Sequence, residues 1–144
     1  MTTLTDEKVN ILLVDDQPNN LLALESILGD MNENLVRAES GRAALRALLD
    51  HDFAVILLDV QMPGGMSGLE TAALIRRRRR SAHTPIIFLT AFGADEVRAA
   101  EGYAQGAVDY ISTPVVPEIL RAKVRVFVDL YRMTDQLKRQ AEER

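Results

Sequence analysis

The sequence predicts an α/β fold: a doubly wound, five-stranded parallel sheet in the strand order 2-1-3-4-5, with helices on both faces. Short apolar runs alternate five times with longer stretches of helical periodicity, and such alternation favours a parallel sheet covered by helices. The first, third and fourth runs are apolar almost throughout, as expected for interior parallel strands. Right-handed crossovers leave few topologies, and this strand order suits five units.

The first two strand–helix units occupy the N-terminal third of the chain. Residues 9–14 predict a strand that ends at Asp15 and Asp16, and Pro18 suits the first turn of the following helix. Residues 35–38 predict a weaker strand, and Ser40 is a suitable N-cap for a helix over 43–49. The first helix has an apolar stripe to bury, made of Leu21, Leu22, Leu24, Ile27 and Leu28.

The other three units continue the same pattern. We expect strands over residues 53–58, 85–90 and 107–111, and helices over 69–79, 95–104 and from Pro117 onward. Thr113 and Pro114 end the fifth strand. Neither Gly nor Pro follows Pro117, so the last helix has the length to run about 40 Å.

The composition is ordinary for a single domain and excludes several classes of site. The 144 residues are 47% hydrophobic and 26% charged, and the absence of cysteine excludes disulfides, thiol nucleophiles and zinc–thiolate sites. Residues 1–8 lack the features of a signal peptide, and no apolar run is long enough to cross a bilayer. We therefore expect a cytoplasmic protein with no membrane partner. The net charge of −4 argues against direct binding of nucleic acid.

Three acids gather at one rim of the predicted sheet. Asp15 and Asp16 end the first strand and Asp59 ends the third, while Thr90 and Thr113 lie at the ends of the fourth and fifth. Ligands of such sheets bind beyond the carboxyl ends of the strands, where the winding reverses.

A single Asp at a strand end is usually a cap or turn former, but three together repel one another unless a cation compensates. No Lys or Arg sits at these strand ends. Mg²⁺ is the natural neutraliser, because it prefers oxygen ligands. An acid beside bound Mg²⁺, with hydroxyls nearby, suits phosphoryl chemistry.

Four stretches resemble the receiver domain of bacterial two-component response regulators. They are ILLVDDQ, VILLDVQMPGGMSGLE, PIIFLTA and GAVDYISTPVVPEIL, in the family's order and spacing. The resemblance covers residues 9–132 and implies the flavodoxin-like receiver fold. It also implies a phosphorylatable signalling switch of a phosphorelay rather than a metabolic enzyme, with self-phosphorylation and slow autodephosphorylation as its only chemistry.

The resemblance assigns roles to individual residues. It implies that Asp59 takes a phosphoryl group from a phosphohistidine of a histidine kinase or phosphotransfer protein. It implies that Mg²⁺ is held by Asp15, Asp16 and Asp59, together with the main-chain carbonyl of Gln61. The Thr90 hydroxyl would then hydrogen-bond the phosphoryl group, and Tyr110 would swing inward in the active state.

Two departures from the family pattern bear on the site. The family has Lys before the Pro of the fifth strand, where this chain has Thr113, and the loop after Asp59 is one residue longer, through Gly64 and Gly65. Thr113 therefore leaves open a degenerate receiver that acts through protein contacts without phosphorylation.

Two other functions on the same fold fit less well. An aspartate-nucleophile phosphatase needs a second Asp two residues after the first, where this chain has Gln61. A nucleotide or flavin binder needs a Gly-rich phosphate loop after the first strand, where this chain has two acids.

The ends of the chain and one basic run complete the predicted organisation. We expect residues 1–8 to be a disordered segment, 9–132 the receiver domain and 133–144 a helical extension. The extension would be a linker to a downstream module, a weak dimer coil or a frayed end, and we favour the linker. The five arginines from Arg76 to Arg80 are interpreted as a solvated face rather than a docking patch.

Overall fold

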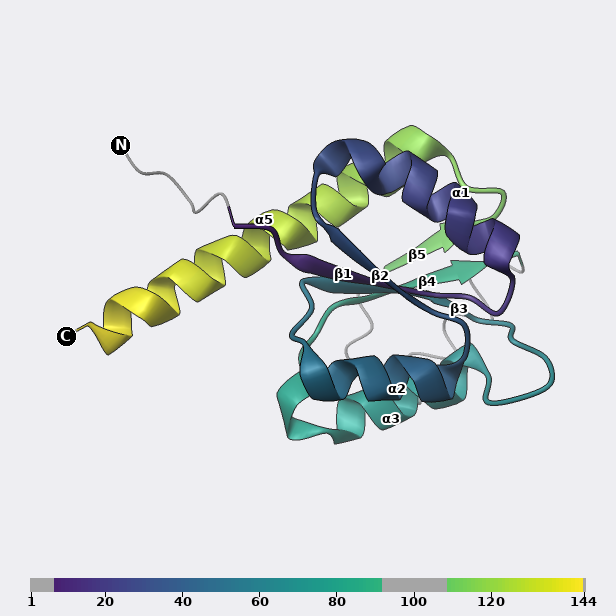
Figure 1. Ribbon diagram of the computed structural model, residues 1–144, viewed down its shortest axis with the longest axis horizontal. Helices are drawn as coiled ribbons and strands as arrows, with labels where there is room; N and C mark the ends of the chain where they lie inside the picture. Colours follow the sequence, from purple (N-terminus) through teal and green to yellow (C-terminus); the bar gives the residue numbers. More distant parts are fainter. Residues whose placement is uncertain (1–6, 92–108, 144) are drawn as a thin grey trace.

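The computed structural model describes residues 7–91 and 109–143, and its centre is a five-stranded sheet (Figure 1). The strands are β1 (Asn10–Val14), β2 (Asn34–Ala38), β3 (Val55–Asp59), β4 (Ile86–Thr90) and β5 (Asp109–Ser112). All four strand pairings are parallel, and the spatial order is β2-β1-β3-β4-β5. The predicted fold class and strand order are therefore confirmed.

The described helices cover both faces of this sheet. They are α1 (Pro18–Leu28), α2 (Gly41–Asp50), α3 (Gly68–Arg77) and α5 (Pro117–Glu142), with short 3₁₀ turns η1 (Gly29–Met31) and η2 (Arg79–Ser81). Figure 1 places α2 and α3 on one side and α1 and α5 on the other. The helix expected over 95–104, and residues 107 and 108 of the fifth expected strand, lie outside the described residues.

Two apolar cores, one on each face of the sheet, explain why polar and apolar residues do not alternate along the central strands. Alternate residues of β3 point to opposite cores: Ile56 and Leu58 face α2 and α3, while Val55 and Leu57 face α1 and α5. All four are fully buried. Burial of each such side chain contributes roughly 1.5–3 kcal/mol. This two-sided burial fixes the end of β3, and with it Asp59, rigidly in the sheet.

Local helix signals are mostly as predicted, with one exception. The Ser40 hydroxyl accepts from the Ala43 amide at 3.0 Å, which confirms it as the N-cap of α2. Leu22, which we counted in the buried stripe of α1, is 58% exposed, and the buried residues of that helix are Leu21, Leu24 and Leu28. The stripe is narrower than the sequence suggests because the sheet contacts one side of α1 only.

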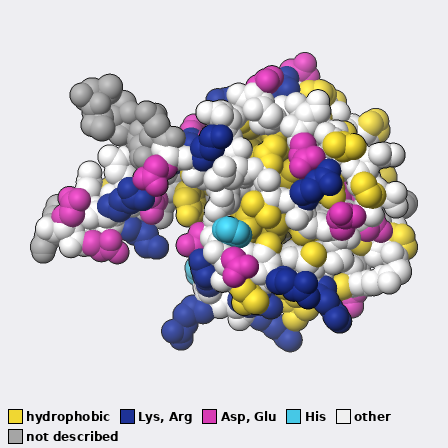
Figure 2. All heavy atoms as spheres, in the orientation of Figure 1, with side chains coloured by type: hydrophobic (Ala, Val, Ile, Leu, Met, Phe, Trp, Pro, Cys, Tyr) yellow, Lys and Arg dark blue, Asp and Glu magenta, His cyan; other side chains and the backbone are white. Residues whose placement is uncertain are grey.

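The interpretation of the arginine run as a solvated face is wrong for Arg76 and Arg78, which are half-buried, while Arg80 is exposed as expected. Arg78 donates to the Leu45 carbonyl at 2.8 Å, and Arg80 donates to the Leu49 carbonyl at 3.0 Å and pairs with Asp52 at 2.6 Å. Arg76 donates to the Ser81 carbonyl at 3.2 Å. Arg80 thus binds a carbonyl in the last turn of α2, where the helix leaves acceptors unpaired, and Arg78 binds a carbonyl one turn earlier. Figure 2 shows Lys and Arg gathered on the α2–α3 side.

The C-terminal helix is one continuous element that begins in the core and extends past the sheet. Leu120, Val124 and Val128 are buried, and Phe127 and Tyr131 pack beside them. Its helical course runs unbroken across the predicted domain boundary at residue 132. Figure 1 shows that the last turns project beyond the start of β1.

Candidate functional site

The three predicted acids converge at the carboxyl edge of the sheet. Asp15 and Asp16 follow β1, Asp59 is the last residue of the adjacent β3, and β1 pairs directly with β3. One carboxylate oxygen from each residue lies within 4.8 Å of the others. This closeness follows from the topology, because the winding of the sheet reverses between β1 and β3.

Asp15 is the buried member of the cluster, with 4% of its surface exposed. Its Oδ1 accepts from the Gln17 amide at 2.9 Å, and the Asn20 amide group donates to both of its oxygens at 3.3 and 3.2 Å. Burial raises the pKa of Asp15, while these hydrogen bonds lower it. The bonds also fix the carboxylate in direction, so that it faces the other two acids.

Asn20 is a site residue that the sequence does not reveal, because a polar residue in the first turns of a helix carries no distinctive signal. In the folded protein, the start of α1 places the Asn20 amide group within hydrogen-bonding distance of the Asp15 carboxylate. Its spacing of five residues after Asp15, on a helix that begins at Pro18, is the only sequence feature that points to the contact.

The pKa of Asp59 is strongly raised. Burial raises its pKa to about 6, the charge of Asp15 adds to this, and a hydrogen bond from the Gln61 amide opposes it. The bond from Gln61 is long, at 3.4 Å. The negative charge of the Asp59 carboxylate is therefore poorly compensated in the folded protein.

Gly68 closes the loop after Asp59, and the path of the main chain there requires a residue without a side chain. The Gly68 amide donates to the Val60 carbonyl at 2.9 Å, and a Cβ at Gly68 would collide with the main chain of Asp59 and Val60. Gly64, in the longer part of the loop, has φ of +92°, which favours glycine. Ser67 and Glu70 then form a capping box that begins α3.

The two predicted hydroxyl residues lie beside the acids, in different environments. Thr90 ends β4 and is 2% exposed, one residue beyond Leu89, the sheet neighbour of Asp59. Thr113 is exposed, and its amide donates to the Thr90 carbonyl at 3.0 Å. Gln61 is exposed next to Asp59. The fold therefore brings all six predicted site residues to one edge.

A groove of about 340 Å³ opens beside the acids, between α1 and the segment after β5. Asp15, Asp59, Asn20 and Thr113 contribute its polar lining, and none of the described residues that line it is Lys or Arg. Its apolar lining consists of Ala23, Leu24, Ile27, Leu89, Pro114 and Val115. Asp59 and Thr113 therefore line the same groove.

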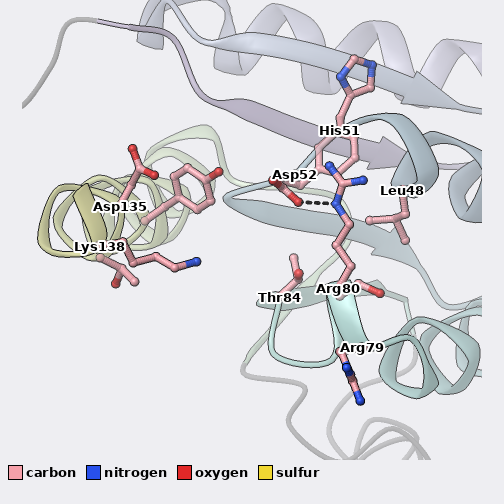
Figure 3. Close-up of a pocket in the computed structure, with 12 residues that line it drawn as sticks. Leu48, His51, Asp52, Arg79, Arg80, Thr84, Asp135 and Lys138 are labelled. Carbon is pink, nitrogen blue, oxygen red and sulfur yellow. Dashed lines mark hydrogen bonds and ion pairs between the residues drawn. The ribbon is translucent and has the colours of Figure 1, made fainter. Parts of the chain in front are cut away.

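A larger cavity, of about 580 Å³, lies at the opposite edge of the sheet (Figure 3). It is bounded by the turn before β3, the turn before β4 and the outer part of α5. Its charges are largely paired within the protein, since Asp52 binds Arg80 at 2.6 Å and Asp135 binds Arg139 at 3.2 Å. The converging carboxylates, and not this cavity, mark the candidate site.

The donor set at the carboxyl edge fits a hard divalent cation. Three carboxylates offer oxygen atoms within 4.8 Å of one another. Burial, and then the charges of the neighbouring carboxylates, raise the pKa values of Asp15 and Asp59. Oxygen ligands in this number suit Mg²⁺, which retains part of its water shell.

Residues 11–125 match the family model of the response regulator receiver domain. The chain belongs to this family. Its relatives include the sensor histidine kinase GacS of Pseudomonas protegens, 37% identical over 117 residues, and the transcriptional regulatory protein SrrA of Staphylococcus aureus, 36% identical over 115 residues. Each match covers 78% of this chain but only 12% of GacS and 46% of SrrA. The receiver domain thus spans less than half of these larger relatives.

Solved receiver structures share the same architecture. Vibrio cholerae chemotaxis protein CheY4 matches with a TM-score of 0.76 and 28% identity, over 83% of this chain and 98% of that one. The receiver domain of the sensor histidine kinase PA1611 from Pseudomonas aeruginosa matches with a TM-score of 0.76 and 25% identity, over 85% and 98%. That structure has a magnesium ion coordinated in its active-site cleft. This chain is therefore a signalling domain of two-component systems.

Proposed function

We propose that this receiver domain is a phosphorylatable switch in which Asp59 takes a phosphoryl group from a phosphohistidine. The observation that carries the proposal is the convergence of Asp15, Asp16 and Asp59 within 4.8 Å at the end of two buried strands. A carboxylate oxygen of Asp59 attacks phosphorus, the P–N bond breaks, and its electron pair returns to the imidazole of the donor. The product is an aspartyl phosphate and a free histidine.

Asp15, Asp16, Asp59 and the main-chain carbonyl of Gln61 are the proposed Mg²⁺ ligands. When bound, Mg²⁺ supplies positive charge that stabilises the transferring phosphoryl group. The hydrogen bonds from Gln17 and Asn20 hold Asp15 in place for this role. The Thr90 hydroxyl is the proposed donor to the phosphoryl group, with Thr113 as a neutral neighbour on the open side of the groove.

The groove between α1 and the segment after β5 is the proposed approach for the phosphodonor. A histidine on a kinase or phosphotransfer protein has to reach Asp59, and the groove opens beside that residue. Ile27 and Val115, which line it, are only partly buried and give a partner apolar surface to contact. The partner's protein class is supported by the relative GacS, a sensor histidine kinase.

A degenerate receiver that signals through protein contacts alone is the second candidate. It is favoured by Thr113, which lines the groove where the family has a lysine. A neutral hydroxyl replaces a charge-assisted hydrogen bond to the phosphoryl group. The cluster of three acids argues for retained phosphorylation, because a receiver without metal chemistry has no need to hold three repelling carboxylates together.

An intact-mass experiment separates these two functions. The protein is incubated with acetyl phosphate and Mg²⁺, with a parallel sample in EDTA and with Asp59→Asn as the control. We expect one added phosphate, stable in acid and labile in base, that requires Mg²⁺ and is absent in the variant. Unmodified wild-type protein under these conditions would favour the degenerate receiver.

We also propose how the domain sits in its cellular context. Residues 9–132 form the receiver unit, and residues 133–144 form an extension that leads to a downstream module or to a second copy of the chain. Among the described helices, none combines the length and the apolar character needed to cross a bilayer. A cytoplasmic location is proposed from the function, since histidine kinases phosphorylate their partners there.

A further inference from the structure

The arginine run from Arg76 to Arg80 divides into two sets of side chains. Arg76, Arg78 and Arg80 donate to main-chain carbonyls. Arg77 and Arg79 are exposed and form no hydrogen bond or ion pair with any described residue. Figure 3 shows Arg79 leaving η2 in the opposite direction from Arg80. Alternate members of the run therefore anchor it to the protein, and the members between them are presented to solvent.

Two arginines of α2 extend this exposed set. Arg42 and Arg46 are four residues apart, so they lie on one side of α2, and both are exposed and unbonded among the described residues. The bond from Arg78 to the Leu45 carbonyl, at 2.8 Å, brings the arginine run against the turn of α2 that carries Arg46. We give the name basic face to the four exposed arginines: Arg42, Arg46, Arg77 and Arg79.

Few acids offset the charge of the basic face. Residues 41–83 contain seven arginines and four acids, whereas the whole chain has 17 basic and 21 acidic residues. Three of these four acids are engaged elsewhere: Asp52 with Arg80, Glu70 in the cap of α3, and Asp59 in the acid cluster. The fourth, Asp50, ends α2. The face is therefore a concentration of unpaired positive charge on a protein whose net charge is negative.

An exposed leucine lies beside the basic face. Leu49 is 63% exposed, and because it follows Arg46 by three residues it lies on the same side of α2. Its carbonyl accepts from Arg80 at 3.0 Å, which places it at the junction of α2 and η2. A partner that docks here can contact an apolar side chain and several guanidinium groups together.

Carboxylates of a short peptide are the anions that this arrangement fits best. A guanidinium donates two parallel N–H groups to one carboxylate, so several separate guanidinium groups suit several carboxylates. The face is small, since α2 has 10 residues and measures about 15 Å. A nucleic acid or a membrane extends past such a face, where it meets the acids that predominate in the rest of the chain. A short acidic segment avoids this repulsion.

We propose that the basic face and Leu49 form a docking surface for a short acidic segment of a partner protein, with an apolar side chain of the segment against Leu49. The surface lies on the side of the sheet opposite α1, which lines the groove beside Asp59 (Figure 1). The contact needs neither Mg²⁺ nor phosphate, so it goes beyond the proposed phosphorelay function.

Fluorescence anisotropy in EDTA tests this surface with a labelled peptide made of Glu and Leu. We expect saturable binding that weakens as salt is added, and no binding of a peptide in which Gln replaces every Glu. Arg46→Gln combined with Arg77→Gln should weaken binding at least about tenfold. The matched control, Arg125→Gln with Lys138→Gln, removes two exposed charges of α5 and should change the Kd by less than about twofold.

The same variants allow a check on folding and on the place of binding. None of the four substituted side chains bonds to another described residue, so thermal melts of both double variants should match the wild type. The amide NMR signals that shift on addition of the peptide should belong to α2, α3 and η2.

A double-mutant cycle tests the apolar contact. Leu49→Gln should weaken binding of the peptide of Glu and Leu, but not of a peptide in which Ala replaces every Leu. Equal losses with both peptides would remove Leu49 from the proposed surface.

Several outcomes would overturn the proposal. They are an absence of binding at millimolar peptide, equal binding by the two double variants, binding of the Gln peptide as tight as that of the Glu peptide, and NMR shifts at α1 or α5 instead. Tighter binding of duplex DNA, or sedimentation with phosphatidylserine vesicles at the same salt, would assign the basic face to a nucleic acid or to a membrane.

Discussion

Asp15 and Asp59 have to be held in fixed positions and also have to carry charge, and these two requirements oppose each other. Asp15 and Asp59 are held by the ends of buried strands, which fixes their positions, but the same burial penalises their charged forms. The Asn20 and Gln17 donors relieve part of the penalty at Asp15. In the proposed site, a bound Mg²⁺ would relieve the rest of this penalty, so the repulsion among the acids in the metal-free protein would contribute to metal affinity.

Asp59→Asn should stabilise the metal-free protein in a pH-dependent manner. The folded pKa of Asp59, about 6, lies above its ordinary value of 3.8, so ionisation of Asp59 costs stability as the pH rises through this interval. The cost is absent below pH 4 and complete above pH 7. With allowance for solvent screening we expect a gain of about 1 kcal/mol for the variant at pH 8.

Urea unfolding in EDTA at pH 8 and pH 4 measures this effect. A gain of equal size at both pH values would mean that packing, and not the charge of Asp59, distinguishes the two proteins.

Magnesium should raise the melting temperature of the wild type and have little effect on Asp16→Ala. A ligand at a hundredfold excess over its Kd stabilises the folded protein by about 2.7 kcal/mol. Asp16 is one of the three acids within 4.8 Å, so its loss removes a ligand without disturbing a buried strand. Thermal melts with millimolar MgCl₂ or EDTA provide the comparison, and an equal shift in both proteins would place the metal elsewhere.

At the level of secondary-structure elements, the segment between β3 and α3 determines where the main chain next to Asp59 lies. Gly68 packs directly against the carbonyl end of β3, and its amide binds Val60. This contact folds the loop back over the strand, so the position of Gln61 depends on a residue seven positions further along.

Gly68→Ala should destabilise the protein by about 1–3 kcal/mol, because its Cβ overlaps rigid main chain. Gly65→Ala is the matched control in the same loop: a Cβ there meets nothing within 4 Å. Thermal unfolding of both variants makes the comparison, and Mg²⁺ affinity should fall only in Gly68→Ala. Equal stabilities would show that the loop yields to the added methyl group.

Thr113→Lys should strengthen the proposed phosphorylation-dependent switch. A charge-assisted hydrogen bond to the phosphoryl group is worth about 1–2 kcal/mol more than one from a hydroxyl, which corresponds to roughly tenfold in the population of the active state. NMR of Tyr110 and β5, with and without beryllofluoride, measures the shift. We expect larger shifts in the Lys variant, whereas a full response of the wild type would indicate that another cation compensates.

For the molecule as a whole, the parallel sheet is the part that sequence reasoning recovers best. Buried parallel strands are continuous apolar runs, and their ends carry the acids, so topology alone brings Asp15, Asp16 and Asp59 together. Contacts that depend on how the folded chain brings side chains together are not encoded in a recognisable sequence pattern. The Asn20–Asp15 bonds and the fit of Gly68 against β3 are local examples, and the arginine bonds to α2 join distant segments.

The exposed side of α5, which carries Val126, Leu130, Met133 and Leu137, illustrates a different limit. The sequence of this helix supports two apolar stripes, and only the docking of the helix decides which one is buried. Both stripes keep a helical spacing, so periodicity alone does not separate the core-facing side from a surface that remains open to a partner.

The proposed acceptor, Asp59, is tested by locating the phosphate on the chain. After incubation with acetyl phosphate and Mg²⁺, borohydride reduces an aspartyl phosphate to homoserine, which tandem mass spectrometry assigns to a residue. We expect homoserine at position 59 alone, dependent on Mg²⁺. Homoserine at Asp15 or Asp16, or a phosphate that persists in Asp59→Asn, would contradict it.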